Sequence, residues 1–378
     1  MKDITRHPAV CWLGATDLVA EGDGIRPTRV PRESGYQLSL PTAFTAGMCS
    51  GVRLAFRTDA EELRLVVNTI RVQVDGADPH PACFDLVVEG ETVAERDSED
   101  GVLLVVDRND INSLRMEEGG PATLEFKDLD PAMKSVEIWL PHTAQVTVSQ
   151  IAVDADSAVE PPHRGPSWIH YGSSISHCMD ADRPGDVWPV VAARNSRKGF
   201  EVTNLGYSGE CHIDQFVARY IRDSNPALIS AKLGINTLTT LVERTFRSAV
   251  HGFFDTVRDG HPTTPLVVCS PIFCPDFETD PHTSLEGDGL SETMSQHFNA
   301  TLTATRIRSI LEEVVASRKE RGDEHLHYLH GLELLGPDDA SDLPDGIHPN
   351  TAGYARMGQR FARKVLGENG LLAQYQFN

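Results

Sequence analysis

The sequence shows neither the long apolar run typical of a membrane protein nor, in residues 1–24, the pattern typical of a secretion signal. No window in its 378 residues approaches the roughly 18 uninterrupted apolar residues that a membrane helix needs. Residues 1–24 contain no basic region followed by a long apolar stretch and a small-residue cleavage site. We therefore expect no membrane span, no standard secretion signal and a cytoplasmic location.

Basic residues are scarce relative to acidic ones. The chain has 34 Lys and Arg against 55 Asp and Glu, which gives a formal net charge of −21 at pH 7. This balance argues against a broad basic patch, and so against binding to nucleic acid or to an anionic membrane surface. It weakly favours a neutral or cationic substrate, because a carboxylate-rich surface repels polyanions at long range.

Repeated, closely spaced cysteine pairs are also missing. The seven cysteines are scattered and show none of the repeated short spacing of a zinc site. We expect them to be reduced and mostly buried, since disulfides are rare in the cytoplasm. Cys178 and Cys211 flank candidate active-site loops, so a contact between these two is possible.

The patterning of the chain changes near residue 155, which predicts two domains in a chain that is long for one hydrophobic core. Residues 1–155 carry many short runs rich in Val, Ile, Leu and Phe, separated by Gly, Pro, Asp and Asn. These runs predict a β-sandwich or jelly roll. Residues 154–166 contain three prolines and several charges. We place the linker at 156–165.

Residues 166–378 alternate between strand and helix patterns. Helical spacing of apolar residues recurs within 213–221 and 250–257. This alternation predicts an α/β domain with a parallel sheet and helices on both faces. Ligands in such domains bind beyond the carboxyl ends of the strands. The strand candidates are SWIHY, FEVTNL, ALISAKL, PLVVCS and HLHYLH.

Four segments after these strands carry residues suited to acyl chemistry. Ser174 follows SWIHY at a strand-to-helix turn, where backbone N–H groups are free to bind an anion. Gly209 lies in NLGYSGECH and Asn236 in KLGINTL, while Asp345 and His348 lie in LPDGIHPNTAGY. Each residue alone has an ordinary explanation as a helix cap, a turn former or a surface histidine.

The set and order of these residues resemble the SGNH hydrolases, also called the GDSL family of esterases and lipases. GSSIS is similar to the first family block, NLGYSG to the second, GIN to the third and DGIHPNTAGY to the last, which is the most specific. The resemblance covers about residues 165–366. It implies a flavodoxin-like three-layer α/β domain with a parallel sheet, preceded here by the all-β sandwich or jelly-roll domain.

Two positions depart from the family pattern. The aspartate that usually precedes the nucleophile is Ser173 here, and the aspartate that often follows the third-block asparagine is Thr237. Neither position is assigned proton transfer or oxyanion binding in the family scheme. The departures therefore bear on substrate range more than on activity, and we expect Ser173 to support the turn by local hydrogen bonding.

The resemblance implies Ser174 as the nucleophile, His348 as its base and Asp345 as the residue that orients the histidine. A serine hydroxyl is a weak nucleophile at neutral pH, and an imidazole, with an ordinary pKa of about 6.5, can accept its proton. The carboxylate would fix the tautomer and stabilise the imidazolium. The implied oxyanion hole consists of the backbone N–H groups of Ser174 and Gly209 and the side-chain amide of Asn236.

These assignments predict a serine esterase that cleaves a carboxylic ester through an acyl-enzyme, with a small-molecule or carbohydrate ester as substrate and no cofactor. The same triad could serve an acyltransferase, a thioesterase or an amidase. An alternative of a different class is a catalytically inactive glycan-binding protein.

Several neighbouring features have more than one interpretation. His170, His177 and His212 surround the nucleophile without metal-ligand spacing, so we expect no metal site. Residues 270–292 are either a lid or specificity loop, or a solvated excursion. Trp188 either packs in the core or lines an acyl or sugar site.

Overall fold

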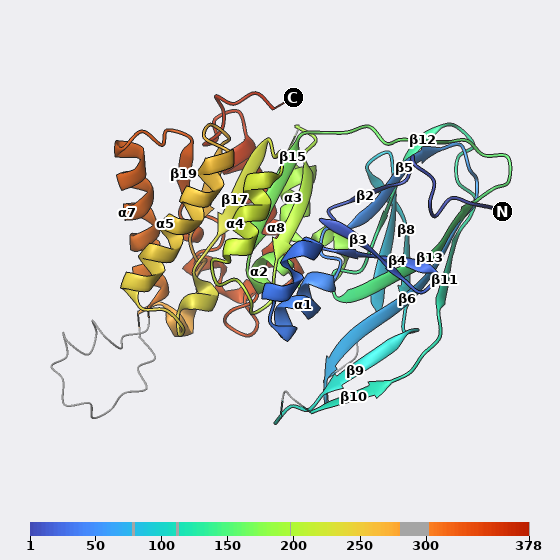
Figure 1. The fold of residues 1–378 in the computed structure, drawn as a ribbon, viewed down its shortest axis with the longest axis horizontal. Coiled ribbons are helices and arrows are strands. Elements are labelled where there is room, and N and C mark those ends of the chain that lie inside the picture. Colours follow the sequence, from blue (N-terminus) through green and yellow to red (C-terminus); the bar gives the residue numbers. More distant parts are fainter. Residues whose placement is uncertain (78–79, 111–112, 197, 280–301, 378) are drawn as a thin grey trace. The chain divides into compact units, whose positions relative to one another are not determined.

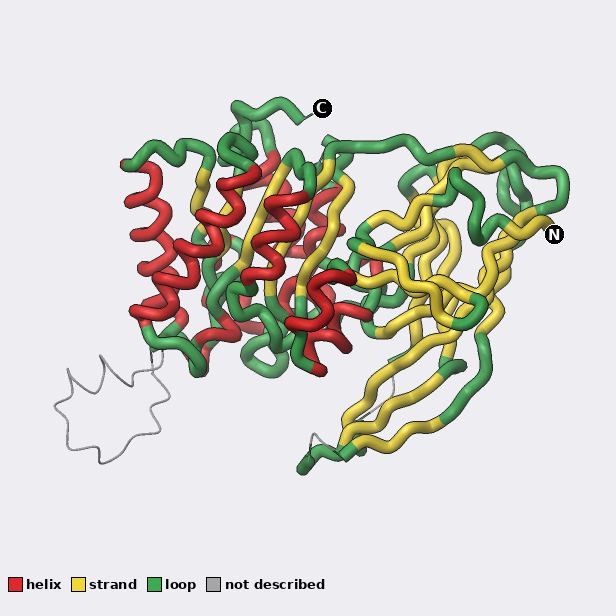
Figure 2. The backbone as a smooth tube through the Cα atoms, in the orientation of Figure 1, coloured by secondary structure: helices red, strands yellow, loops and turns green. Residues whose placement is uncertain are grey.

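The computed structural model describes residues 1–378 except 78–79, 111–112, 197, 280–301 and 378. It contains two compact units. The first comprises Met1–Arg164 together with Asp182–Val187, and the second comprises Gly165–Ala181 together with Trp188–Asn378. Strands dominate the first unit, whereas the second combines strands with many helices (Figures 1 and 2).

The first unit is built from two sheets that share one apolar core. Their pairs are antiparallel, except that β6 and β9 run parallel. The eight-stranded sheet comprises β1 (Lys2–Asp3), β3 (Asp17–Glu21), β4 (Gly24–Thr28), β6 (Leu63–Val74), β9 (Val102–Val106), β10 (Leu114–Glu117), β11 (Ala122–Phe126) and β13 (Ala144–Val153). The six-stranded sheet comprises β2 (Cys11–Leu13), β5 (Arg53–Thr58), β7 (Ala82–Val88), β8 (Glu91–Ser98), β12 (Lys134–Trp139) and β14 (Val159–Glu160).

Strand β6 shows why these residues form a half-buried sheet. Leu63, Leu65 and Val67 are buried, while the residues between them are partly exposed. Successive side chains of a strand point to opposite faces, so this alternation places one apolar face on the core. The core also takes Phe56 from β5 and Ile138 from β12, and thereby joins the two sheets. The predicted all-β domain is confirmed.

The first unit also contains helical turns that the sequence analysis did not predict. The 3-10 helix η1 (Arg32–Gln37) precedes α1 (Leu40–Gly47). Ser39 caps α1 by accepting a hydrogen bond from the N–H of Thr42, and Pro41 lies in the first turn. A serine cap followed by an early proline is the signal that could have revealed this helix.

A short segment from later in the chain completes the first unit. Residues 182–187, which include the 3-10 helix η2 (Pro184–Asp186), are flanked on both sides by the second unit but cluster with the first. The Arg183 guanidinium donates to Asp85 on β7 at 2.6 Å and to Asp97 on β8 at 2.5 Å. Asp85 is almost fully buried, so Arg183 supplies the counter-charge that its carboxylate requires.

The second unit contains a parallel five-stranded sheet. Its strands are β15 (Ser167–Gly172), β16 (Glu201–Gly206), β17 (Leu228–Lys232), β18 (Leu266–Cys269) and β19 (Leu326–Leu329). Their spatial order is β16-β15-β17-β18-β19, which is the flavodoxin-like order. The strand order reverses between β15 and β17, and ligands bind such sheets beyond the carboxyl ends of the strands at that point.

Helices cover this sheet in two groups. Helix α3 packs on α8, whereas α4 packs on α5, which also contacts α7. The longer helices are α3 (Trp188–Arg194), α4 (Gln215–Asp223), α5 (Glu243–Gly260), α7 (Ala304–Glu320) and α8 (Thr351–Phe361), which continues into the π-helical η7 (Ala362–Leu366). The shorter ones are α2 (Ser174–His177), η3 (Ile235–Thr237), η4 (Pro275–Phe277), η5 (Gly331–Glu333) and η6 (Pro337–Asp342). The predicted three-layer α/β domain is confirmed.

Within the described part of the chain, no helix is both long enough and apolar enough to span a membrane.

Replacing Arg183 with methionine should destabilise the first unit. The change leaves the Asp85 carboxylate buried without its partner, and breaking a buried pair in this way costs about 3 kcal/mol. Chemical denaturation measures the loss. Arg26→Met removes a more exposed pair with Glu21 and should cost less than about 1 kcal/mol. If R183M and R26M lowered the free energy of unfolding by the same small amount, the pair with Asp85 would not be a stability determinant.

Candidate active site

The candidate nucleophile lies at a tight turn between β15 and α2. Ser173 caps α2, because its hydroxyl accepts a hydrogen bond from the N–H of Ile175 at 3.3 Å. Gly172 permits the turn: a Cβ there would lie 2.3 Å from Ser176 Oγ. Ser174 is the first residue of α2, where backbone N–H groups have no partner within the helix.

The structure brings the three predicted triad residues together. His348 Nε2 lies 2.9 Å from Ser174 Oγ, although the two residues are 174 positions apart. On the other side of the ring, His348 Nδ1 lies 2.7 Å from Asp345 Oδ2. Ser174 is 8% exposed. These distances form a continuous hydrogen-bonded chain from carboxylate to hydroxyl.

The carboxylate of Asp345 is held in its ionised form. Burial acts to raise its pKa, but hydrogen bonds from the N–H and the ring of His348 and from the N–H of Ile347 outweigh burial and hold the pKa below its usual value. An ionised carboxylate facing Nδ1 favours the tautomer with its proton on Nδ1. Nε2 is then left as the acceptor for the serine proton.

Asn236 lies in η3, just beyond the end of β17, with its amide orientation fixed. Its Oδ1 accepts a hydrogen bond from the backbone N–H of Cys211 at 3.1 Å. Because the oxygen is engaged, the amide nitrogen remains as the donor that an oxyanion would need. Gly209 has a φ of +75°, a conformation that favours glycine. Ser174, Gly209, Asn236 and His348 all line one hollow of about 420 Å³.

The loop that carries Gly209 is fastened to the end of β15 by two residues that the sequence analysis missed. The hydroxyl of Tyr171 donates to the Asp214 carboxylate and accepts from the N–H of Asp214 at 3.1 Å. At the start of the loop, the N–H of Tyr207 donates to the carbonyl of Gly172 at 2.9 Å. Burial raises the pKa of Asp214, while the bond from Tyr171 opposes the shift. The aspartate just before α4 was the available signal, since aspartate favours helix starts.

Of the three histidines near the nucleophile, His170 and His177 are buried and His212 is exposed. His170 is fully buried, and its two ring nitrogens lie 2.7 Å from Ser230 Oγ and 2.8 Å from Ser176 Oγ. Burial, aided by the charge of Lys232, lowers the pKa of His170 to about 3. Trp188 is fully buried, with its ring 4.7 Å from that of His170, and therefore belongs to the core. In the described ranges, no three His, Cys, Asp or Glu side chains are grouped to hold a metal ion.

Three buried cysteines, Cys211, Cys269 and Cys274, lie near Lys232 at the end of β17. All seven cysteines are free, and six of them are buried. Lys232, the last residue of β17, is 1% exposed. Burial lowers the pKa of Lys232 to about 8, although neighbouring buried cysteines act in the opposite direction. The ammonium group is therefore costly to keep charged at this position.

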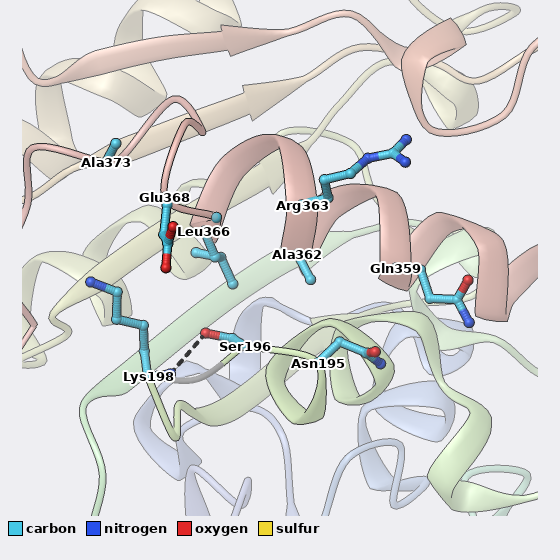
Figure 3. A pocket seen from close by; sticks show the side chains of 10 residues that line it. Asn195, Ser196, Lys198, Gln359, Ala362, Arg363, Leu366, Glu368 and Ala373 are labelled. Carbon is cyan, nitrogen blue, oxygen red and sulfur yellow. Dashed lines mark hydrogen bonds between the residues drawn. The ribbon is translucent and has the colours of Figure 1, made fainter.

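A second hollow, of about 800 Å³, lies elsewhere on the second unit (Figure 3). Residues around the end of α3, including Asn195 and Lys198, face residues of α8 and η7, including Gln359 and Arg363. None of the predicted site residues lines it. No histidine is among its described lining residues, and its serine, Ser196, accepts a hydrogen bond from the backbone N–H of Lys198 at 3.2 Å, so we place the chemistry at the smaller hollow.

The predicted loop 270–292 is only partly described, because residues 280–292 lie outside the described residues. Its first part contains η4, and Phe277 of that turn lines the hollow at Ser174.

Comparison with family models finds one match in each part of the chain. Residues 167–366 match the GDSL-like lipase/acylhydrolase family. Residues 10–149 match the family described as the N-terminal domain of SsfX3. No match was found among curated proteins.

Comparison with solved structures finds relatives that span both units. The salicylyl-acyltransferase SsfX3 from a tetracycline biosynthetic pathway is 26% identical, with a TM-score of 0.80 over 96% of each chain. A family two carbohydrate esterase mutant from Clostridium thermocellum is 13% identical, with a TM-score of 0.61 over 97% of this chain and 99% of that one. An acetyl xylan esterase from the rumen bacterium Butyrivibrio proteoclasticus is 11% identical, with a TM-score of 0.56 over 96% of each chain. The two esterases show the fold alone.

Replacing Asn236 with alanine is expected to lower kcat by about a hundredfold or more while changing KM little, because the amide would act only on the charge that develops in the transition state. Steady-state hydrolysis of p-nitrophenyl acetate measures both constants. Asn195→Ala, which removes an exposed asparagine that does not line the hollow at Ser174, provides the matched control. An unchanged kcat in N236A would remove Asn236 from the oxyanion hole.

Replacing Lys232 with methionine should change how stability depends on pH. The folded-state pKa of about 8 lies below the ordinary 10.5, so between these values the unfolded chain holds a proton that the folded chain has lost. Wild-type stability relative to K232M should therefore rise by on the order of 2 kcal/mol between pH 7 and pH 10. Urea denaturation at both pH values measures this difference, with exposed Lys198→Met as the control. Parallel pH profiles for K232M and wild type would contradict the assignment.

Proposed function

The chain belongs to the GDSL-like lipase/acylhydrolase family, and we propose that it is a serine acyltransferase that carries an acyl group on Ser174 and passes it to an acceptor other than water. The observation that carries the proposal is the 26% identity with a salicylyl-acyltransferase over 96% of both chains. The sequence analysis favoured water as the acceptor and held acyl transfer as an alternative. The comparison supports transfer more strongly than hydrolysis.

In the proposed first half-reaction, Ser174 Oγ attacks the acyl carbonyl of the donor while His348 Nε2 takes the hydroxyl proton. The carbonyl oxygen becomes an oxyanion, which the N–H groups of Ser174 and Gly209 and the amide of Asn236 would bind. As the tetrahedral intermediate collapses, the bond to the leaving group breaks and His348 returns the proton to that group. The products are the acyl-enzyme and the protonated leaving group.

In the second half-reaction, the acceptor hydroxyl attacks the acyl-enzyme carbonyl and gives its proton to His348. The ester bond to Ser174 then breaks, and His348 returns the proton to Ser174 Oγ. Asp345 stabilises the imidazolium in both halves through its bond to Nδ1 and does not itself take the proton.

Hydrolysis of carboxylic esters is the second candidate. The observation that favours it is exposure: the His348 and Asp345 side chains are 29% and 52% exposed. Water can therefore reach the base in the described structure and compete with another acceptor. A small-molecule or carbohydrate ester as substrate and a cytoplasmic location stay predictions.

Replacing Ser174 with alanine should abolish labelling by a fluorophosphonate probe and lower both transfer and hydrolysis by roughly 10⁴-fold or more, because no acyl-enzyme can form. The test uses p-nitrophenyl acetate as donor, with and without a high concentration of a neutral polyol acceptor. Transfer is measured as acylated polyol and hydrolysis as free acetate. Ser309→Ala, a serine on α7 whose hydroxyl bonds its own helix backbone, is the control.

Two results would contradict these assignments. Labelling that survives in S174A would reject Ser174 as the nucleophile. Acetate as the sole product, across a panel of hydroxyl and amine acceptors, would reject transfer and leave hydrolysis.

A further inference from the structure

The hollow at Ser174 has an apolar wall. Its lining combines the candidate catalytic residues with four apolar side chains and the small polar residues Ser208 and Thr239. No lysine, arginine, aspartate or glutamate is among the described lining residues. The four apolar residues are Ile235, Leu238, Phe277 and Ile347.

Three different loops build this wall around the nucleophile. Ile235 and Leu238 follow β17, Phe277 follows β18, and Ile347 follows β19 and immediately precedes His348. The wall therefore lies beside both the serine that would carry the acyl group and the base that would activate it. A group attached to Ser174 Oγ through its carbonyl would extend along these side chains.

The residue after Phe277, Glu278, forms an ion pair with the buried Arg308. Arg308 on α7 is 4% exposed, and two of its nitrogens donate to the two carboxylate oxygens of Glu278 at 2.7 and 2.6 Å. Arg308 also donates to the carbonyl oxygens of Pro271 and Ile272, each at 2.8 Å. The turn that presents Phe277 is thus fixed at both of its ends.

A fixed apolar wall favours apolar acyl groups over charged ones and large acyl groups over small ones. Apolar groups gain by leaving water in proportion to their buried area, and a preformed site loses little conformational freedom on binding. A charged acyl group would give up its hydration without finding a lysine, arginine, aspartate or glutamate partner among the described lining residues. An acetyl group is too small to contact the whole wall.

We infer that the site is specific for a bulky, uncharged, apolar acyl group, branched or aromatic, and that Phe277 is a specificity-determining residue which Arg308 and Glu278 position. This inference rests on the proposed acyl-enzyme at Ser174. It concerns the acyl group alone and holds for transfer and for hydrolysis.

The test compares p-nitrophenyl acetate, isobutyrate, benzoate and monosuccinate, which share one leaving group. Each kcat/KM is divided by the rate constant of the same ester with hydroxide, so that intrinsic reactivity cancels. The isobutyrate and benzoate ratios should exceed the acetate ratio by about tenfold or more, and the succinate ratio should fall below it. A wild-type enzyme that prefers acetate or succinate after this correction overturns the inference.

Phe277→Ala should lower the benzoate ratio about tenfold more than it lowers the acetate ratio, and Phe277→Leu should fall between wild type and alanine. Phe377→Ala is the matched control, because Phe377 packs on Phe200 and does not line the hollow. Equal losses for acetate and benzoate in F277A would show a general structural role and would overturn the assignment of Phe277.

Arg308→Lys tests the positioning role, because lysine keeps the charge but loses the paired contact with Glu278. The benzoate-to-acetate ratio should fall toward that of F277A, with fluorophosphonate labelling of Ser174 preserved. Glu278→Gln keeps one side-chain oxygen that can accept a hydrogen bond from Arg308. This variant should therefore retain more of the benzoate-to-acetate ratio than R308K does. A ratio unchanged in R308K would reject the positioning role.

Fluorophosphonate labelling of Ser174 distinguishes a failure of the proposed function from a failure of the acyl-group inference alone. If the wild-type protein forms no adduct at Ser174, the proposed function itself fails. If labelling is intact but the corrected ratios show no preference for apolar acyl groups, only the present inference fails.

Discussion

The hydrogen bond between His348 Nε2 and Ser174 Oγ is the interaction on which the proposed chemistry depends, and it joins residues 174 positions apart. No local preference of either segment can form it. The parallel sheet makes it possible because all five strands present their carboxyl ends at one edge, so that the loops after β15 and β19 meet there. The turn Asp345–His348 adds a local contact that orients the imidazole.

Behind this contact lies a layer of buried polar groups that are mutually satisfied. His170 lies between Ser176 and Ser230, and Tyr171 is bound to Asp214. A buried polar group without a partner is costly, so such networks select one arrangement of the surrounding backbone. The backbone that they select is the turn carrying Ser174 and the loop carrying Gly209. These hydrogen-bonded groups thus support the nucleophile turn, while the His348 and Asp345 side chains are partly exposed to solvent.

The scaffold and the specificity of the site reside in different parts of the chain. Carbohydrate esterases at 11–13% identity share the fold, which shows that the sheet and its order tolerate extensive change. The apolar wall around Ser174 belongs to loops, where side chains can vary without disturbing the core. Phe277 illustrates this division, since its position depends on Arg308 of α7 rather than on the sheet. We therefore propose that the specificity of this site is set by loop residues and by the ion pairs that hold them.

The sequence alone determined the features that have a local signature. Alternating and helical periods predicted both domain types, and four short motifs that resemble family blocks marked Ser174, Gly209, Asn236 and the Asp345–His348 pair as candidate site residues. Helix α1 was missed within a region of short strands, although Ser39 and Pro41 marked its start. Only the tertiary structure decided which distant residues meet. The contacts Cys211–Asn236, Tyr171–Asp214, Arg308–Glu278 and Arg183–Asp85 join segments that are 25, 43, 30 and 98 positions apart. Such contacts leave no periodic trace in the sequence, because each depends on the packing of whole elements rather than on the conformation of neighbouring residues.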